Sequence, residues 1–324
     1  MKLVTFRDKA GDHVGALVNK DANIIDLKVA AKSKGLKTTY FKDMLTLIEG
    51  GDAALDLART AEKYGLSTGS GLIKKADVKI LAPVPRPPSL RDYPCFEEHM
   101  INTNAKMIKE LTKIAPQNAE ALKLFFEFGE ALWHQRPVEC KWNPYDVTGT
   151  DTDVTWPSYS QMLDYELEFG LYIGKKGKNI ERSKAMEHVF GYTIFNDISA
   201  RDEAAKDMFL LVCGITRGKN WDSSKPMGPC IVTADSFDPY NATMIVRVNG
   251  EERGRNNSRT MFWKFEDLLE YFSKEQTLYP GEFLASGTPG KGAGIETGKL
   301  LEPGDVVELE VEGIGILRNR IVKP

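Results

Sequence analysis

One segment, residues 163–173, constrains the fold more than any other part of the chain. It reads Leu-Asp-Tyr-Glu-Leu-Glu-Phe-Gly-Leu-Tyr-Ile, with apolar residues at every odd position. Residues two apart on a strand point to the same side, so Glu166 and Glu168 project together, opposite an apolar face. Adjacent carboxylates repel each other unless a cation or solvent lies between them. Taken alone, the segment favours the ordinary interpretation of a strand with a solvated polar face.

Other short runs show similar apolar or alternating patterns that are typical of strands, and helical spacing is confined to a few segments. Apolar or alternating runs predict strands over residues 14–18, 23–27, 77–81, 191–196, 244–248, 283–286, 306–311 and 314–322. Helices are predicted from Asp26 onward and over residues 40–48, 53–64, 183–189 and 265–273. Because strands dominate, we expect a mixed α+β chain built on a mixed sheet or β-roll.

A proline-rich run over residues 83–88 divides the chain. Four prolines in six positions impose extended, poorly hydrogen-bonded backbone. We therefore predict a small N-terminal α/β domain at 1–80 and a larger domain at 83–324.

A helical insertion is predicted at about 105–135 in the larger domain. This segment is rich in Ala, Lys, Leu and Glu, and Pro116 divides it into two short helices. Helical spacing predicts a buried apolar stripe on the second helix, made of Leu122, Phe125, Phe126 and Leu132. A lid, a dimer contact and a core element all fit this insertion.

Composition excludes several classes of protein. The 324 residues carry 43 Lys and Arg against 46 Asp and Glu, a formal charge of -3, so no strong field favours nucleic acid or an anionic membrane. There is no apolar run long enough to span a bilayer and no signal-peptide pattern, so a cytoplasmic location is expected. The cysteines fit no zinc motif and are expected to be free thiols: Cys95, Cys140, Cys213 and Cys230.

A third acidic residue indicates that the paired glutamates could belong to a cation-binding site. Asp197 follows a predicted strand, and strand ends are where side chains converge on a site. A set of carboxylates suits a hard cation such as Mg²⁺, Mn²⁺ or Ca²⁺ better than zinc.

Asp92 lies seven residues before His99, which taken alone would be an ordinary surface histidine. Residues 285–294 form a glycine-rich loop that matches no nucleotide-binding motif and fits one passing close to a ligand.

Four elements in this order resemble the fumarylacetoacetate hydrolase family. They are an Asp-x6-His segment, the strand Leu-Asp-Tyr-Glu-Leu-Glu, the loop Asn-Asp-Ile-Ser-Ala-Arg-Asp, and Ala-Ser-Gly-Thr before a Gly-Asp-x-Val strand. The similarity runs from about Pro83 to the C-terminus. The resemblance implies the family's mixed β-roll, which is usually a homodimer, preceded by the small N-terminal domain of some members.

The resemblance also implies a metal centre. Four acids match the family's ligands for a divalent cation: Asp92, Glu166, Glu168 and Asp197. Mg²⁺ or Mn²⁺ is the expected ion, with Ca²⁺ as an alternative.

Roles in catalysis follow from the same resemblance. His99 matches the catalytic histidine and Glu302 the glutamate that orients it. Arg201 and Lys219 match cationic groups near the substrate, and Thr288 matches a threonine that contacts the substrate. At four positions the chain departs from the family's substrate-contacting residues: Pro94, Ile108, Ala204 and Met208. We therefore expect a substrate other than fumarylacetoacetate.

The implied activity is metal-dependent hydrolysis of a carbon–carbon bond in a small keto-acid, an acylpyruvate-like 1,3-diketo acid or related 2-oxo acid, as in aromatic compound catabolism. The alternatives are an isomerase, a decarboxylase or a hydratase/lyase acting on 2-oxo or sugar-acid derivatives. A non-catalytic, metal-stabilised binding protein is the alternative from a different class. No nucleic-acid or membrane partner is expected.

Overall fold

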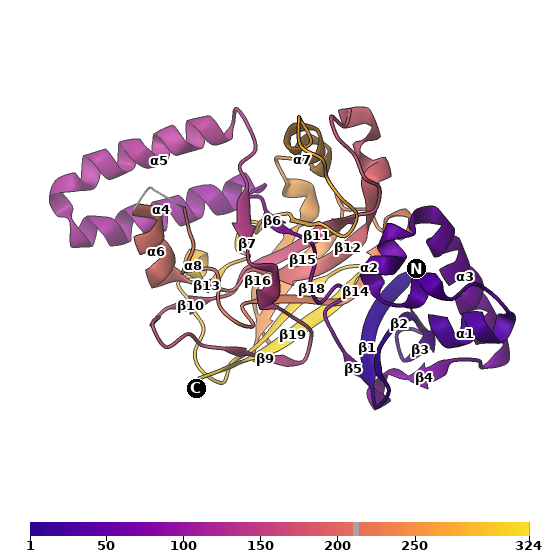
Figure 1. The fold of residues 1–324 in the computed structure, drawn as a ribbon. Helices are drawn as coiled ribbons and strands as arrows, with labels where there is room; N and C mark the ends of the chain where they lie inside the picture. The colour runs from indigo at the N-terminus through magenta and orange to yellow at the C-terminus, as the bar shows by residue number, and fades with distance from the viewer. Residues whose placement is uncertain (210–213, 324) are drawn as a thin grey trace.

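The computed structural model describes residues 1–209 and 214–323, and it confirms a mixed α+β fold built around sheets. Within these residues the strands form one large sheet, a five-stranded sheet and a two-stranded pair. Figure 1 shows the N-terminal elements at one end of the molecule and a long helical hairpin at the other. None of the helices in this part of the chain is long and apolar enough to cross a membrane.

The N-terminal segment adds its strands to the large sheet. Its elements are β1 (Lys2–Asp8), β2 (Gly11–Val18), β3 (Asn23–Asp26), α1 (Leu27–Lys34), η1 (Thr39–Phe41), α2 (Met44–Glu49), α3 (Gly51–Thr68), β4 (Leu72–Lys74), η2 (Lys75–Asp77) and β5 (Lys79–Ile80). β1 pairs antiparallel with β14 (Lys225–Thr233), so that Leu3 lies opposite Ile231. The predicted domains at 1–80 and 83–324 therefore share one sheet, and their division stays a prediction.

Short polar residues set the limits of the N-terminal helices. The Asp26 carboxylate accepts the backbone N–H of Val29 at 2.9 Å and caps the start of α1. Gly35 ends the same helix with a φ of 75°, in the left-handed region that glycine adopts readily. Asp43 caps α2 in the same way through the N–H of Thr46.

The central strands of the large sheet position the acidic residues. In the order β14-β12-β11-β17-β6-β7, the strands besides β14 are β6 (Leu90–Asp92), β7 (Cys140–Trp142), β11 (Leu167–Ile173), β12 (Val189–Asn196) and β17 (Phe283–Ala285). β11 pairs antiparallel with both β12 and β17, and β6 runs parallel to β17. β8 (Val147–Thr148) pairs with β14.

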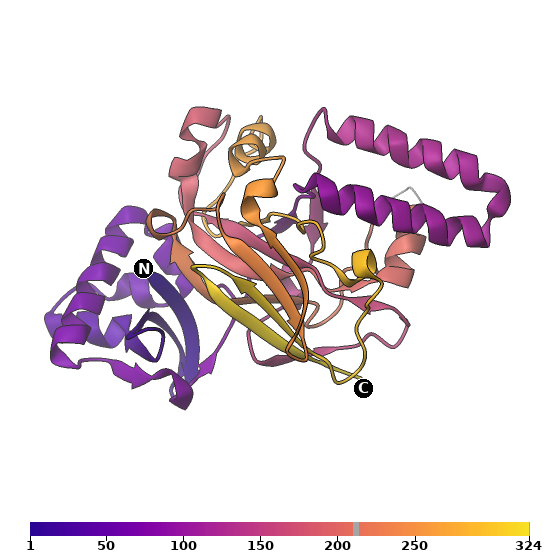
Figure 2. The same cartoon turned by 180° about the vertical axis from the view of Figure 1, so that it is seen from behind.

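A second sheet packs against the first. Its strands are β9 (Thr152–Thr155), β15 (Thr243–Val248), β16 (Glu251–Asn257), β18 (Val306–Val311) and β19 (Gly315–Val322). β15, β18 and β19 lie close to the predicted ranges, whereas β9 and β16 are not predicted by the sequence pattern. Phe169 of β11, Val246 of β15 and Leu309 of β18 belong to one buried apolar cluster between the sheets. Figure 2 shows these late strands, orange to yellow, lying across the central strands. The helical elements around them are α7 (Phe265–Phe272), η4 (Pro144–Asp146), η5 (Arg182–His188), η6 (Ala234–Ser236) and η7 (Ser258–Thr260).

The predicted strand over 163–173 is broken in the structure. It forms β10 (Leu163–Asp164), which pairs with β13 (Ser199–Ala200), and β11, with Tyr165 and Glu166 between them. Every residue from 163 to 173 is buried, including both glutamates. The interpretation of a solvated polar face is therefore wrong, because other strands and loops cover both sides of this segment.

The insertion forms a helical hairpin that projects from the sheets (Figures 1 and 2). It consists of α4 (Glu97–Ile114), η3 (Pro116–Asn118) and α5 (Ala119–Trp133), so Pro116 divides it as predicted. Phe126 is buried, but Phe125 is 44% exposed and Leu132 41% exposed. The predicted buried stripe is wrong at those two positions, and Leu122 is only half-buried. The far part of the hairpin projects away from the sheets (Figures 1 and 2), whereas Trp133 at its end packs against Phe262.

The cysteines match the expectation of free thiols as far as the structure describes them. Cys95 and Cys230 are buried and Cys140 is half-buried, and all three are free. Cys213 lies outside the described residues.

Candidate active site

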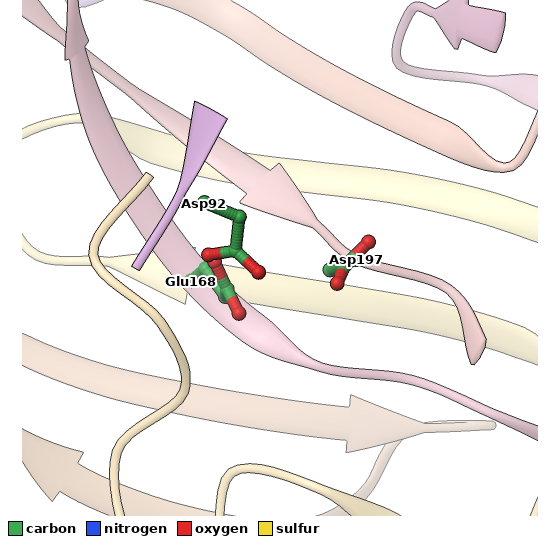
Figure 3. A group of neighbouring side chains, drawn as sticks. All are labelled: Asp92, Glu168 and Asp197. Atoms are coloured by element: carbon green, nitrogen blue, oxygen red, sulfur yellow. The ribbon is translucent and has the colours of Figure 1, made fainter. Parts of the chain in front are cut away.

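Three acidic residues meet where neighbouring strands of the large sheet end or begin. Asp92 is the last residue of β6, Glu168 is the second of β11, and Asp197 directly follows β12. Each offers a carboxylate oxygen, and these oxygens all lie within 4.8 Å of one another. Figure 3 shows the carboxyl groups of Asp92 and Glu168 side by side, with Asp197 across from them. We call these residues the acidic triad.

The acidic triad is buried and only partly hydrogen-bonded. Asp92 is 8% exposed, Glu168 1% and Asp197 0%. Glu168 Oε1 accepts the Thr288 hydroxyl at 3.0 Å, and Asp92 Oδ2 accepts the Trp142 indole N–H at 3.3 Å. The other oxygens, Asp92 Oδ1 and Glu168 Oε2, have no hydrogen-bond partner among the described residues. Buried oxygens without partners are costly, and a hard cation would satisfy them.

Burial and mutual repulsion shift the pKa values of these acids. Desolvation, aided by the charge of Asp197, raises the pKa of Asp92 to about 7. Burial and then the charge of Asp92 raise the pKa of Glu168 well above its usual range. Both shifts have the direction expected of carboxyl groups gathered in a low-dielectric site, where the charge of Lys219 offsets burial and repulsion only in part. The residues therefore fit a divalent cation.

The fourth predicted ligand, Glu166, is held by cations of the chain itself. Arg201 Nη2 lies 2.7 Å from its Oε1, and Lys219 Nζ lies 2.5 Å from its Oε2. Burial opposes its ionisation, but the charges of Arg201 and Lys219 outweigh burial and hold the pKa of Glu166 below its usual range. Its role as a metal ligand stays a prediction.

Two lysines hold Asp197 from opposite sides. Lys219 Nζ lies 2.5 Å from Oδ2, and Lys225 Nζ lies 2.5 Å from Oδ1. Lys225 is 0% exposed and was not recognised in the sequence, because Lys-Pro at the start of a strand carries no signature of a site.

His99 lies beside this network and is oriented by Glu296. Its Nδ1 is 2.9 Å from Glu296 Oε2, and its Nε2 is 3.7 Å from Glu166 Oε1. Asn102 donates to Glu296 Oε1 at 3.1 Å. Burial alone would raise the pKa of Glu296, but hydrogen bonding to His99 and the charge of His99 bring it below its usual range. Glu296 is therefore ionised, and His99 donates its Nδ1–H to it.

The prediction that Glu302 orients His99 is wrong. Glu302 is exposed, in a turn where its backbone N–H donates to Asp305 at 2.8 Å. Glu296 takes its place because the chain turns back at α8 (Gly294–Thr297) and brings that carboxylate to α4. A four-residue helix in a glycine-rich segment has no periodic pattern, so the sequence did not reveal it.

Asp164 is a third residue that sequence reasoning missed, after Lys225 and Glu296. It is fully buried, accepts Arg201 Nε at 2.8 Å, and accepts the backbone N–H of Gly294 at 2.8 Å. It thus connects Arg201 with the loop that presents Glu296. The available signal was its place in the predicted strand, two residues before Glu166 on the same face.

Metal binding to the acidic triad should depend on pH. Below pH 7, protons occupy the oxygens that a cation would take, because the pKa of Asp92 and that of Glu168 are raised. We expect Mn²⁺ to raise the thermal unfolding temperature of chelator-stripped protein more at pH 8 than at pH 6. Differential scanning fluorimetry measures this difference.

Substitution within the triad provides the control. Glu168→Gln should abolish the Mn²⁺-dependent rise, whereas Asp146→Asn should keep it, since Asp146 is also a buried acid with an oxygen lacking a partner but lies outside the triad. Equal shifts in wild type and Glu168→Gln would argue against the triad as the metal site.

Known proteins resemble this chain in sequence and in fold. Residues 95–322 match the family model described as fumarylacetoacetate (FAA) hydrolase, C-terminal. A cattle protein named oxaloacetate tautomerase FAHD2A, mitochondrial, is 32% identical over 331 residues, covering 99% of this chain and 92% of that protein.

Solved structures show the same fold over the whole chain. The fumarylacetoacetate hydrolase of Exiguobacterium antarcticum has a TM-score of 0.75 and 25% identity, with 100% of both chains covered. The maleylpyruvate hydrolase of Sphingobium sp. SYK-6, solved with manganese(II) and pyruvate, has a TM-score of 0.72 and 23% identity, covering 100% of this chain and 99% of that one. With the family model matched over most of its length, this chain belongs to the fumarylacetoacetate hydrolase family.

Proposed function

We propose that this protein is a divalent-metal-dependent enzyme that moves a proton beside the carbonyl of a small 2-oxo acid. The reaction we favour is keto–enol tautomerisation of an oxaloacetate-like dicarboxylic acid. The observation that carries the proposal is His99, oriented by Glu296 at 2.9 Å beside a buried cluster of carboxylates. The 32% identity over 99% of the chain with a protein named oxaloacetate tautomerase supports this choice over hydrolysis.

The acidic triad would hold the cation, with Mg²⁺ or Mn²⁺ as the proposed ion. A cation held there would polarise the 2-oxo group of the substrate and lower the cost of negative charge on its oxygen. The oxygens of Asp92 and Glu168 that have no partner in the described chain support this assignment. The manganese in the Sphingobium structure is a further argument for a divalent ion.

His99 would carry the proton. Because its Nδ1–H is donated to Glu296, Nε2 carries the lone pair, and the Thr103 hydroxyl contacts this ring nitrogen at a long 3.4 Å. Substrate would displace that contact and present a C–H group to the lone pair. His99 removes the proton beside the keto group, and the substrate oxygen gains a proton to give the enol, so no atom is lost. Glu166, 3.7 Å from Nε2, stabilises the imidazolium between the two transfers.

Arg201 and Lys219 would keep the carboxylates in place for this step. Both make buried ion pairs with Glu166, so their positive charges are partly neutralised before substrate binds. Thr288 positions Glu168 through its hydroxyl. Direct contacts of these three side chains with substrate stay predictions, as do the homodimer and the cytoplasmic location.

Hydrolysis of a carbon–carbon bond in an acylpyruvate-like acid is the second candidate. The same Nε2 would take a proton from water as the water oxygen adds to the carbonyl carbon farther from the carboxylate. The bond between that carbon and the carbon lying between the two carbonyls then breaks, and the departing enolate is protonated. Lys219 or Arg201 would stabilise the oxyanion. The 25% identity to the Exiguobacterium hydrolase over the full chain favours keeping this candidate.

His99→Ala should lower kcat for oxaloacetate tautomerisation by about 10²–10⁴-fold, the usual contribution of a general base. The ultraviolet absorbance of the enol measures the rate. His188→Ala is the matched control, because His188 lies on η5 and contacts the Lys175 carbonyl. Unchanged turnover in His99→Ala would refute the proposed base.

NMR of the products distinguishes the candidate reactions. Oxaloacetate and a panel of acylpyruvates should be incubated with wild type and Mg²⁺ or Mn²⁺. Interconversion of keto and enol forms supports the tautomerase, and pyruvate with a second acid supports the hydrolase. Release of CO₂ or hydration would indicate the decarboxylase or hydratase alternatives. Conversion of none of these acids would support a non-catalytic binding protein.

Glu296→Gln should reduce kcat with little change in KM. The neutral amide can still fill the space between His99 and Asn102, but it cannot stabilise the imidazolium. A decrease on the order of 10- to 100-fold is expected, smaller than the loss of the base itself. Glu302→Gln should retain full activity. Steady-state kinetics on the two variants decide between these glutamates, and a larger loss in Glu302→Gln would restore the sequence-based assignment.

A further inference from the structure

Lys225 is a buried cation placed against a proposed metal ligand. Its side chain is 0% exposed, and its Nζ lies 2.5 Å from Asp197 Oδ1 and 3.4 Å from the Ile198 carbonyl. Nζ is also 5.3 Å from the centre of the Trp142 ring. The ammonium group thus lies between a carboxylate and an aromatic face, in a position set from three sides.

Lys225 differs from the other cations of the site in what it contacts. Arg201 bridges Asp164 and Glu166, and Lys219 bridges Glu166 and Asp197. Lys225 makes its ion pair with Asp197. Since Lys219 already pairs with Oδ2 of Asp197, Lys225 is not needed to give that carboxylate a first partner.

The net charge of the buried ionic groups indicates what Lys225 contributes as the second partner of Asp197. Five carboxylates, those of Asp92, Asp164, Glu166, Glu168 and Asp197, lie with three cations, Arg201, Lys219 and Lys225. When these five carboxylates are ionised, they exceed the three cations by two negative charges, and Asp146, which the charge of Lys225 also reaches, is a further buried acid nearby. Without Lys225 the surplus would be three, and Oδ1 of Asp197 would be released.

We infer that Lys225 is a positioning residue that fixes Asp197 and limits the affinity of the acidic triad for divalent cations. This inference rests on the proposed metal site. A positive charge at this distance repels a second cation, and a buried position leaves the repulsion poorly screened by salt. The same ion pair keeps Asp197 compensated when no metal is bound. Lys225 therefore keeps Asp197 in place in the metal-free protein and weakens cation binding enough for the metal to exchange.

Isothermal titration calorimetry of MnCl₂ into chelator-stripped full-length protein tests this. Lys225→Met keeps the length and packing of the side chain but removes its charge, and it should bind Mn²⁺ about tenfold or more tightly than wild type. Lys225→Gln, which keeps a hydrogen-bond donor, should change affinity in the same direction. Lys323→Met is the control and should match wild type, because Lys323 also lies near a tryptophan ring, 5.8 Å from that of Trp156, but is exposed.

Thermal unfolding provides a readout independent of activity. The metal-free Lys225→Met protein should unfold at a lower temperature than wild type, because Asp197 has lost one of its two partners. The difference should narrow when Mn²⁺ is saturating, since the cation then takes over the lost charge. A structural role alone would leave the difference unchanged by Mn²⁺.

The outcomes separate this inference from the proposed function. If wild type takes up no Mn²⁺ or Mg²⁺, the metal site itself is refuted. If wild type binds Mn²⁺ and both Lys225 variants bind it equally or more weakly, only the role of Lys225 is refuted. If both variants aggregate with and without Mn²⁺, Lys225 serves folding, and the inference is rejected.

Discussion

The central constraint on this protein is the burial of carboxylates at the end of a sheet. Ionised acids in a low-dielectric interior are stable only when cations or hydrogen-bond donors compensate them. Arg201, Lys219 and Lys225 provide part of that compensation. Asp92 and Glu168 receive less, and their raised pKa values follow from it. The site is therefore arranged around a charge that the chain itself does not supply.

The oxygen ligands of the acidic triad and the imidazole of His99 lie close together but are held by different residues. The acidic triad offers oxygen ligands, while Glu166 lies between the cations and the imidazole of His99. Glu296 approaches from a different loop and fixes the direction of the histidine N–H. A carbonyl group polarised on one side and a base on the other suit proton transfer next to a keto group, and with water they suit hydrolysis. The fold alone does not choose between these reactions.

The remaining architecture supports the site from a distance. The N-terminal strands extend the large sheet through β1 and β14, and β14 begins with Lys225. The helical hairpin carries His99 near the start of α4, where Trp133 anchors it by donating its indole N–H to the Pro94 carbonyl at 2.7 Å. Apolar residues such as Phe128 remain exposed farther along the hairpin. His99 is thus positioned by the anchored end of the insertion.

The sequence by itself determined several of the strands, the helical division at Pro116 and the identity of the acids, because those depend on local periodicity and on residue type. It did not reveal strands such as β9, β14 and β16, which lack a clear alternating pattern. It also identified the family through motifs whose order along the chain is distinctive. Tertiary structure decided which acids share one small volume, that both faces of residues 163–173 are covered, and that Phe125 is exposed. It also decided that Glu296 and not Glu302 meets His99, and that Lys225 meets Asp197. These contacts join residues far apart in the chain, and local patterns carry no information on which distant loops will meet.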